Sequence, residues 1–235
     1  MESIQSASYE QFINKEEVSI DYVSSSPIWG LYDVLNISSK QPATGEIVPN
    51  GAHWCFFQPH CKMDQVGTDG HPKRGSFMPD PPDLPRRMFA GSNLTFHKDI
   101  FIGDDIKKIQ CIKSITPKTG NSGKLLFVKV EEKIFSNNQL AISQLNDIVY
   151  RESPKNNQAS QNIPLTFNRK YSWLEKISTN SIMLFKYSAI TFNGHRIHYD
   201  LPYVTNIEKY PGLVVHGPLT ATLLMNLCKN SNPGK

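Results

Sequence analysis

Apolar and polar positions alternate along the middle of the chain, between residues 88 and 152. Leu126, Val128 and Val130 lie two positions apart, which is the spacing of side chains on one face of a β-strand. The segment KTGNSG separates this run from an earlier apolar run and has the composition of a hairpin turn. The pattern predicts three or four antiparallel strands.

Two other segments have the pattern of helices. An apolar run from Ile28 to Leu35 follows a serine-rich stretch, and Pro27 lies at its start, where a missing N–H does no harm. The segment YPGLVVHGPLTATLLMNLCKN has helical length and is rich in Leu, Ala and Met. We expect this second helix to begin near Pro211 and Gly212.

Three further segments complete the predicted organisation. The apolar run IMLFKYSAITF, at 182–192, is predicted as a buried strand. Residues 62–87 are rich in glycine and proline, so we expect a long, ordered covering loop there. The polar stretch SPKNNQASQNIP, at 153–164, is predicted as a linker between an N-terminal domain, 1–152, and a C-terminal domain, 165–235.

Composition excludes some classes of protein. The formal net charge of the 235-residue chain is +4, and no dense stripe of Lys and Arg accompanies it, so nucleic acid is not an expected partner. No apolar run reaches the ~20 residues that a membrane helix needs. The N-terminus lacks a secretory signal, and the four cysteines have no framework spacing. We therefore expect a cytoplasmic enzyme or binding protein.

Polar side chains gather in the short stretch TFNGHRIHYD, at 191–200. It contains His195 and His198, and histidine titrates near neutral pH, which suits proton transfer. A lone His-x-x-His pair in a loop is more often a surface feature. The stretch alone therefore leaves both interpretations open.

Longer motifs resemble one known family. The segments FNGHRIHYD and YPGLVVHGPLTATLL, together with HWCFFQP, GHPKRGSFMPDPPDLPRRMFAGSNLTFH and IGD, resemble the MaoC-like hydratase/dehydratases, specifically their mesaconyl-CoA hydratase-like branch. The resemblance implies an α+β fold, a double hot dog in which each half wraps an antiparallel sheet around a central helix. The N-terminal hot-dog domain looks complete, and the C-terminal one looks shortened at its end.

The resemblance also implies roles for the histidine stretch. In the broad family the motif is Asp-x-Asn-Pro-x-His, and the matching positions here are Asn193, His195, Arg196 and His198. His198 would carry most of the proton transfer, with His195 or Asp200 as a second participant. Asn193 replaces the acid and cannot exchange a proton at neutral pH, so it would orient water or substrate.

The stretch VVHGPL would supply the other half of the site. A helix that begins there presents backbone N–H groups and the positive end of its dipole. By resemblance, the Gly217 N–H donates to the thioester oxygen as it gains negative charge. The neighbouring His216 is expected to be structural.

Anionic parts of a substrate could be bound by several cations. Arg196, Arg86 and Arg87 suit a carboxylate or the phosphates of CoA, although a surface ion pair or a solvated loop explains them equally well. Zinc ligands also occur in the aromatic-rich stretch GAHWCFFQPH and just after it, at His53, Cys55, His60 and Cys61. Their spacing matches no usual zinc pattern, so no metal is expected. The chemistry that the resemblance implies needs no cofactor either, since CoA enters as part of the substrate.

The resulting hypothesis is a hydro-lyase that adds or removes water on an acyl-CoA thioester, with a mesaconyl-CoA-like compound as the expected substrate. One alternative is a 3-hydroxyacyl-thioester dehydratase of fatty-acid synthesis. Another is a non-catalytic acyl-CoA-binding protein or a subunit completed by a partner chain. A shortened hot dog exposes a sheet edge, which favours a homodimer or such a partner.

Overall fold

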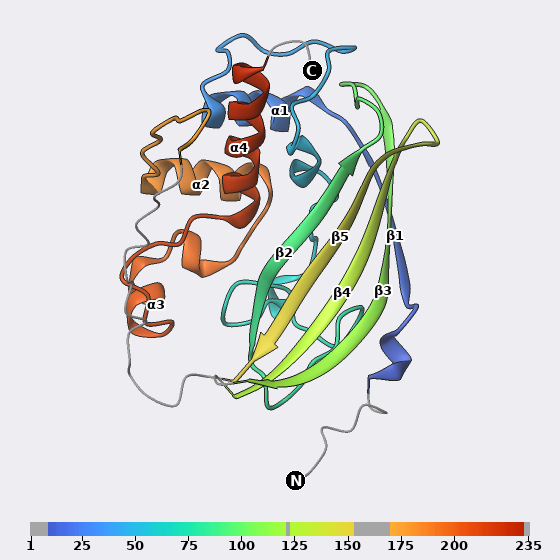
Figure 1. The fold of residues 1–235 in the computed structure, drawn as a ribbon, viewed down its shortest axis with the longest axis vertical. Coiled ribbons are helices and arrows are strands. Elements are labelled where there is room, and N and C mark those ends of the chain that lie inside the picture. The colour runs from blue at the N-terminus through green and yellow to red at the C-terminus, as the bar shows by residue number, and fades with distance from the viewer. Residues whose placement is uncertain (1–8, 121–122, 153–169, 233–235) are drawn as a thin grey trace. The chain divides into compact units, whose positions relative to one another are not determined.

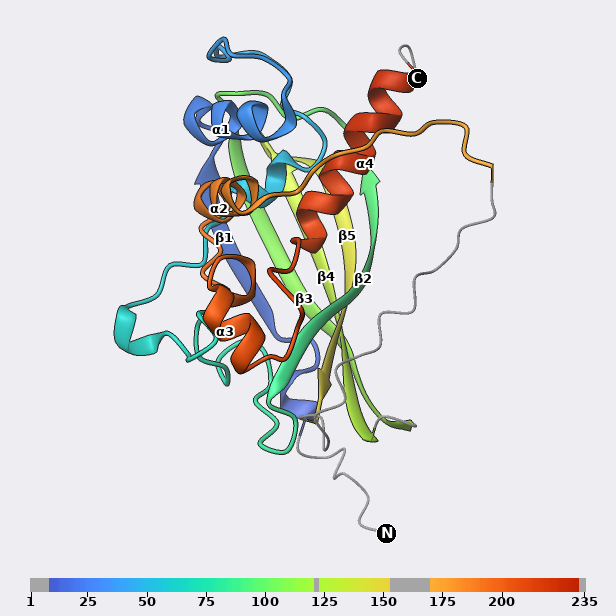
Figure 2. The same ribbon diagram turned by 90° about the vertical axis from the view of Figure 1, so that its left-hand side faces the viewer.

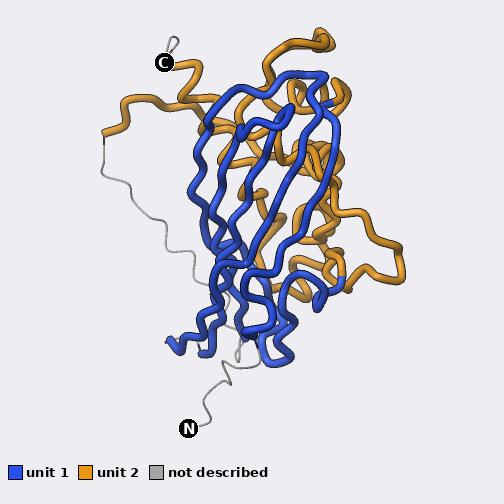
Figure 3. Tube along the Cα trace, turned by 90° about the vertical axis from the view of Figure 1, so that its right-hand side faces the viewer, with its two compact units in different colours: residues 1–23, 73–155 blue, residues 24–72, 156–235 orange. Residues whose placement is uncertain are grey.

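The computed structural model describes residues 9–120, 123–152 and 170–232. The chain divides into two compact units, coloured separately in Figure 3. One unit comprises residues 1–23 and 73–155, and the other comprises 24–72 and 156–235. The predicted linker at 153–164 lies outside the described residues, and the division into two hot-dog domains stays a prediction.

The first unit is built on one antiparallel sheet of five strands, labelled in Figure 1. The strands lie in the order β1-β3-β4-β5-β2. Their bounds are Glu16–Tyr22 for β1, Arg86–Phe96 for β2, Asp105–Gly120 for β3, Gly123–Ser136 for β4 and Gln139–Arg151 for β5. The strands predicted after residue 88 are therefore confirmed, and Gly120 pairs with Gly123 where the hairpin was expected.

Alternating side chains of the central strands form the core of this unit. Ile112, Leu126, Val128 and Tyr150 are fully buried. Phe77 and Leu84, from the loop before β2, pack into the same cluster. The apolar residues that recur at every second position in the sequence are thus the residues whose side chains are buried.

Strand β1 was not predicted from the sequence. It pairs only with β3, at one edge of the sheet. Its apolar residues Val18 and Ile20 are exposed rather than buried. An edge strand held mainly by backbone hydrogen bonds leaves little signal in the pattern of hydrophobic positions.

The second unit is helical. It contains α1 (Ser25–Leu35), α2 (Ser181–Ile190), α3 (Leu201–Asn206) and α4 (Gly217–Ser231), which Figure 2 shows from a second side. The predicted helix at Ile28–Leu35 is confirmed as α1. Gly30 lets α1 approach α2 closely, because a Cβ at that position would meet the side chain of Ile190.

The strand predicted at 182–192 is wrong, because this segment forms helix α2. Asn180 caps the helix, and its side chain accepts a hydrogen bond from the Met183 N–H over 2.9 Å. Leu184 and Tyr187 are buried, whereas Ile182 and Phe185 are exposed. Apolar residues on both faces hide the helical period, so a short apolar run does not separate helix from strand.

The predicted start of the last helix is also wrong. Helix α4 begins at Gly217, with Pro218 in its first turn, and not near Pro211. Val214 lies in the segment before it and bonds through its N–H to the Ile197 carbonyl over 3.0 Å. Hydrogen bonding to a neighbouring loop therefore holds this segment out of the helix. No helix among the described residues is long and apolar enough to cross a membrane.

Candidate active site

The candidate site lies in the helical unit, and its centre is His198. This residue ends a short 3₁₀ turn, Arg196–His198, and its side chain is buried. Its Nδ1 lies 2.7 Å from the carbonyl oxygen of Val214. A carbonyl oxygen only accepts, so Nδ1 carries the hydrogen and Nε2 keeps its basic lone pair.

The surroundings of His198 favour its neutral form. Burial is the main cause that lowers the pKa of His198 below its ordinary value. The charge of His71 lowers the pKa further, while the hydrogen bond to Val214 opposes the shift. A neutral imidazole with a free Nε2 is the form that accepts a proton from water.

His216 holds the plane of the His198 ring. The two rings are stacked, with centroids 3.6 Å apart and an interplanar angle of 18°. His216 is completely buried, and its Nε2 lies 2.8 Å from the Ser188 hydroxyl on α2. Burial and the nearby His198 lower the pKa of His216 to about 3, so this ring stays neutral at physiological pH. The expected structural role of His216 thus becomes a specific one, which is to position His198.

Gly217 is the first residue of α4 and follows His216 directly. The first four N–H groups of a helix have no partner within the helix, and they lie at the positive end of its dipole. The sequence places this helix end one residue from the ring that stacks on His198. The structure therefore brings the two predicted halves of the site, residues 191–200 and VVHGPL, into one unit.

Asn193 and Arg196 both stabilise the loop that carries His198. The Asn193 side-chain oxygen accepts the His195 N–H over 3.0 Å. Arg196 donates from Nε to Asp200 over 2.9 Å and from Nη1 to the Thr68 carbonyl over 3.0 Å. Asp200 in turn caps α3 by accepting the Tyr203 N–H. That bond and the Arg196 guanidinium hold the pKa of Asp200 below its ordinary value, so Asp200 stays ionised.

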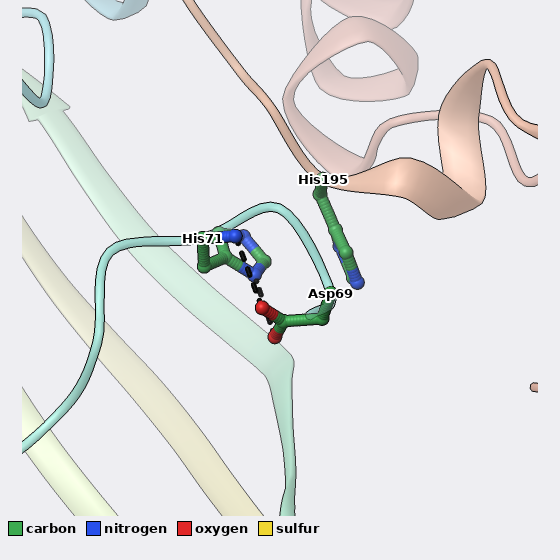
Figure 4. Close-up of side chains that lie close together, drawn as sticks. All are labelled: Asp69, His71 and His195. Carbon is green, nitrogen blue, oxygen red and sulfur yellow. Dashed lines mark hydrogen bonds and ion pairs between the residues drawn. The ribbon is translucent and has the colours of Figure 1, made fainter. Parts of the chain in front are cut away.

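A second group of polar side chains was not predicted as part of the site. Figure 4 shows Asp69 and His71, on the loop before residue 73, facing His195 from the 193–200 loop. The Asp69 carboxylate accepts from His71 Nδ1 over 3.2 Å and from the His71 backbone N–H over 3.0 Å. Burial alone would raise the pKa of Asp69, but the hydrogen bonds from His71 and the charges of both histidines outweigh it and hold that pKa well below the usual range.

Aromatic contacts connect this group to His198. The rings of His71 and His195 have centroids 4.1 Å apart, and those of His195 and His198 meet edge to face at 5.4 Å. One ligand atom from each of Asp69, His71 and His195 lies within 4.8 Å of the others, an arrangement that could hold a metal ion. In the sequence, Asp69 and His71 stand out only as two polar residues in the short segment TDGHP. Nothing in the sequence pattern connects that segment with the 193–200 loop, which lies more than a hundred residues further along the chain.

Two predicted substrate-binding residues belong to the other unit. Arg86 and Arg87 begin strand β2, where Arg87 pairs with Tyr150 of β5. Their part in binding stays a prediction.

The chain matches the family described as hydroxyacyl-thioester dehydratase type 2 over residues 51–235. It is 38% identical over 227 residues to the mesaconyl-C(4)-CoA hydratase of Chloroflexus aurantiacus, covering 96% of this chain and 80% of that protein. It is 26% identical to the mitochondrial hydroxyacyl-thioester dehydratase type 2 of Schizosaccharomyces pombe, covering 91% of this chain and 79% of that protein.

Solved structures show the same fold. The MaoC-like dehydratase of Phytophthora capsici superposes with a TM-score of 0.65 at 12% identity, covering 94% of this chain and 76% of that one. HtdX of Mycobacterium tuberculosis gives a TM-score of 0.62 at 13% identity, covering 93% and 78%. The predicted α+β hot-dog fold of MaoC-like proteins is confirmed. The chain belongs to the hydroxyacyl-thioester dehydratase type 2 family, whose named members are hydro-lyases.

Proposed function

We propose that this protein catalyses the reversible addition of water to an enoyl-CoA thioester, with a C-methylated dicarboxylic substrate such as mesaconyl-CoA as the first candidate. The observation that carries the proposal is the state of His198, a neutral imidazole whose Nδ1 is committed to Val214 and whose Nε2 is left as a base. The identity to the Chloroflexus aurantiacus hydratase supports the choice of substrate.

His198 transfers the proton in this mechanism. Its Nε2 accepts a proton from water as the oxygen forms a bond to the β-carbon. The electron pair of the C=C bond then moves toward the thioester, and the imidazolium returns its proton to the α-carbon. A positioned acid–base group of this kind typically contributes ~10² to 10⁴ in rate.

The Gly217 N–H stabilises the charge that develops on the thioester oxygen. This donor belongs to the first turn of α4, so the helix fixes its direction before the reaction begins. Gly217 has no side chain, which allows the thioester to approach the backbone closely. Asn193 keeps its proposed role in orienting water or substrate through its amide NH₂, while its oxygen accepts the His195 N–H.

Substrate binding is proposed for His195, Arg196, Arg86 and Arg87. Arg196 would have to exchange its ion pair with Asp200, at 2.7 Å from Nη2, for an anion of the substrate. No cofactor is required for this chemistry, and CoA enters as part of the substrate.

Assembly and compartment are part of the same proposal. Exposed apolar side chains on α2 and α4, including Phe185 and Leu224, support a homodimer or a completing partner chain. All four cysteines are free thiols, which supports a reducing compartment such as the cytoplasm.

A panel of thioesters tests the function. Purified protein is mixed with mesaconyl-CoA, crotonyl-CoA or a medium-chain 3-hydroxyacyl-CoA, and the enoyl-thioester absorbance is followed. We expect the fastest turnover with mesaconyl-CoA. A preference for the 3-hydroxyacyl thioester would favour the alternative, a 3-hydroxyacyl-thioester dehydratase, which is the activity in the family's description. Binding without turnover of any of them would overturn the catalytic proposal.

A further inference from the structure

Asp69, His71 and His195 have the chemistry of a transition-metal site. Two imidazoles and one carboxylate are a common ligand set for Zn²⁺ and related ions. One potential ligand atom from each of these three side chains lies within 4.8 Å of the other two. Among the residues that the structure describes, this is the group of His, Cys, Asp and Glu side chains that could hold a metal ion. All three residues are partly buried, so the site is sheltered and still within reach of solvent.

The distance between His71 and Asp69 already suits an ion. Their Nδ1 and Oδ2 atoms lie 3.2 Å apart and share a hydrogen. Two ligand atoms that are each bound to one tetrahedral ion at ~2.0–2.1 Å lie about 3.3 Å from one another. An ion can therefore replace the shared hydrogen with almost no movement of these two side chains, and only the His195 ring has to turn inward.

Close contact between two loops fixes the positions of the ligands. Gly70 has a positive φ of +90°, and a Cβ at Gly70 would overlap the Gly194 carbonyl oxygen. The Arg196 N–H donates to the Asp69 carbonyl over 2.9 Å, directly beside the cluster. Loops locked in this way present preorganised ligands, which is the main requirement for a metal site.

The surrounding hydrogen bonds orient the carboxylate. Asp69 Oδ1 accepts the His71 N–H over 3.0 Å, and Oδ2 lies 3.2 Å from His71 Nδ1. Arg196, beside His195 on the 193–200 loop, is paired with Asp200. Secondary hydrogen bonds to a ligating carboxylate are typical of protein metal sites.

We propose that Asp69, His71 and His195 bind one divalent transition-metal ion of the Zn²⁺ type, with at least one coordination position left for water or for an oxygen of a ligand. Three protein ligands with an open position distinguish such a site from a closed structural one. The proposal concerns binding of the ion and does not depend on the proposed hydratase activity.

Competition against a chromophoric chelator tests it directly. The full-length protein is stripped of metal, and Zn²⁺ is titrated in. We expect one ion per chain, bound at micromolar concentration or tighter, with no displacement by millimolar Mg²⁺, because Mg²⁺ prefers oxygen ligands. Asp69→Asn and His195→Ala should each weaken binding by about tenfold or more.

Controls separate this site from adventitious binding. His97→Ala removes an exposed histidine, and Cys61→Ser and Cys228→Ser remove the two thiols that are not buried. All three variants should bind Zn²⁺ like the wild type. Absence of stoichiometric binding, or wild-type affinity in both Asp69→Asn and His195→Ala, would overturn the proposal.

A spectrum covers the case in which a ligand variant fails to fold. The wild-type protein is loaded with Co²⁺, whose visible spectrum reports the ligand atoms. Bands of nitrogen and oxygen coordination support the site, and an intense thiolate charge-transfer band would assign the metal to cysteine instead and reject it.

Discussion

His198 is held from two sides, by one hydrogen bond and by one stacked ring. The bond to Val214 fixes its tautomer, and His216 fixes its plane. The orientation of His198 Nε2 is therefore fixed without a hydrogen bond to a carboxylate. Asn193 is then available to stabilise the loop through its bond to the His195 N–H, and it need not take part in proton transfer. This arrangement is compatible with an amide, Asn193, at the position where the broad family motif has an acid.

Gly217 allows a test of a single backbone N–H. Proline at this position removes the N–H, and the first helical position tolerates proline. His216, at φ −62° and ψ 134°, already has the conformation that precedes proline. We expect Gly217→Pro to lower kcat by about 10²–10³, which is typical of losing one oxyanion donor, and circular dichroism checks that the variant is folded, since Pro218 follows this position.

Gly217→Ala keeps the N–H but adds a Cβ, so it measures the part of the loss that comes from crowding the thioester rather than from the missing donor. Steady-state kinetics with the best substrate of the thioester panel compare the two variants. Equal kcat values for Gly217→Pro and the wild type would rule out this N–H as the donor.

Residue-scale prediction from the sequence worked where the chemistry lies within one short motif. The stretch at 191–200 and the VVHGPL segment were both found in this way, and the structure places His198 beside His216. Asp69 and His71 were not found, because they meet His195 only through contacts between loops. The ring that stacks on His198 was recognised as structural, but a stacking partner leaves no trace in spacing.

At the scale of elements, local pattern predicted the sheet well and the helical unit less well. Strands β3 to β5 have one buried face, so alternation marks them clearly. Helix α2 carries apolar residues on both its buried and its exposed faces, which erased the period of a helix. The start of α4 depends on a bond between Val214 and Ile197, and such tertiary bonds cannot be derived from sequence patterns.

The contact between the two site loops predicts a strong effect of a single methyl group. Gly70→Ala adds the cost of a positive φ and a clash with the Gly194 carbonyl. Gly45→Ala, in the same unit, adds only the first cost, since φ is +85° there and nothing lies within 4 Å of the added Cβ. We expect Gly70→Ala to reduce the free energy of unfolding by at least ~1 kcal/mol more than Gly45→Ala.

Urea unfolding of the two variants beside the wild type measures this difference. Equal losses of stability would show that the loops separate easily and that the site is not preorganised.

At the scale of the whole molecule, stability depends on pH through the buried histidines. The pKa of His216 is about 3 in the folded state, against ~6.5 for an unperturbed histidine. Below pH ~6.5 the unfolded chain binds a proton at this residue and the folded chain does not, so acid favours unfolding. Stability from His216 is present above pH ~6.5 and is lost as pH falls below it, by up to ~1.4 kcal/mol per pH unit.

Free energies of unfolding in urea at pH 7.5, 6.5 and 5.5 check this dependence. His216→Gln should be less stable at pH 7.5 and should lose less stability on acidification than the wild type. His97→Gln, a change at an exposed histidine, is the control and should follow the wild type. An unchanged slope in His216→Gln would show that this ring does not stay neutral in the fold.

The family and the class of reaction were predictable from the sequence because long motifs carried the resemblance, and the comparisons confirm both. The identity of the acyl chain was not predictable from the sequence, because it depends on which apolar and charged side chains surround the bound thioester.

Hydration of the best thioester substrate by the wild type and by His198→Ala tests the central claim most directly. The wild type should turn over, His198→Ala should be slower by about 10²-fold or more while it stays folded, and His97→Ala should match the wild type. Wild-type turnover by a folded His198→Ala protein would contradict the assignment of His198 as the base.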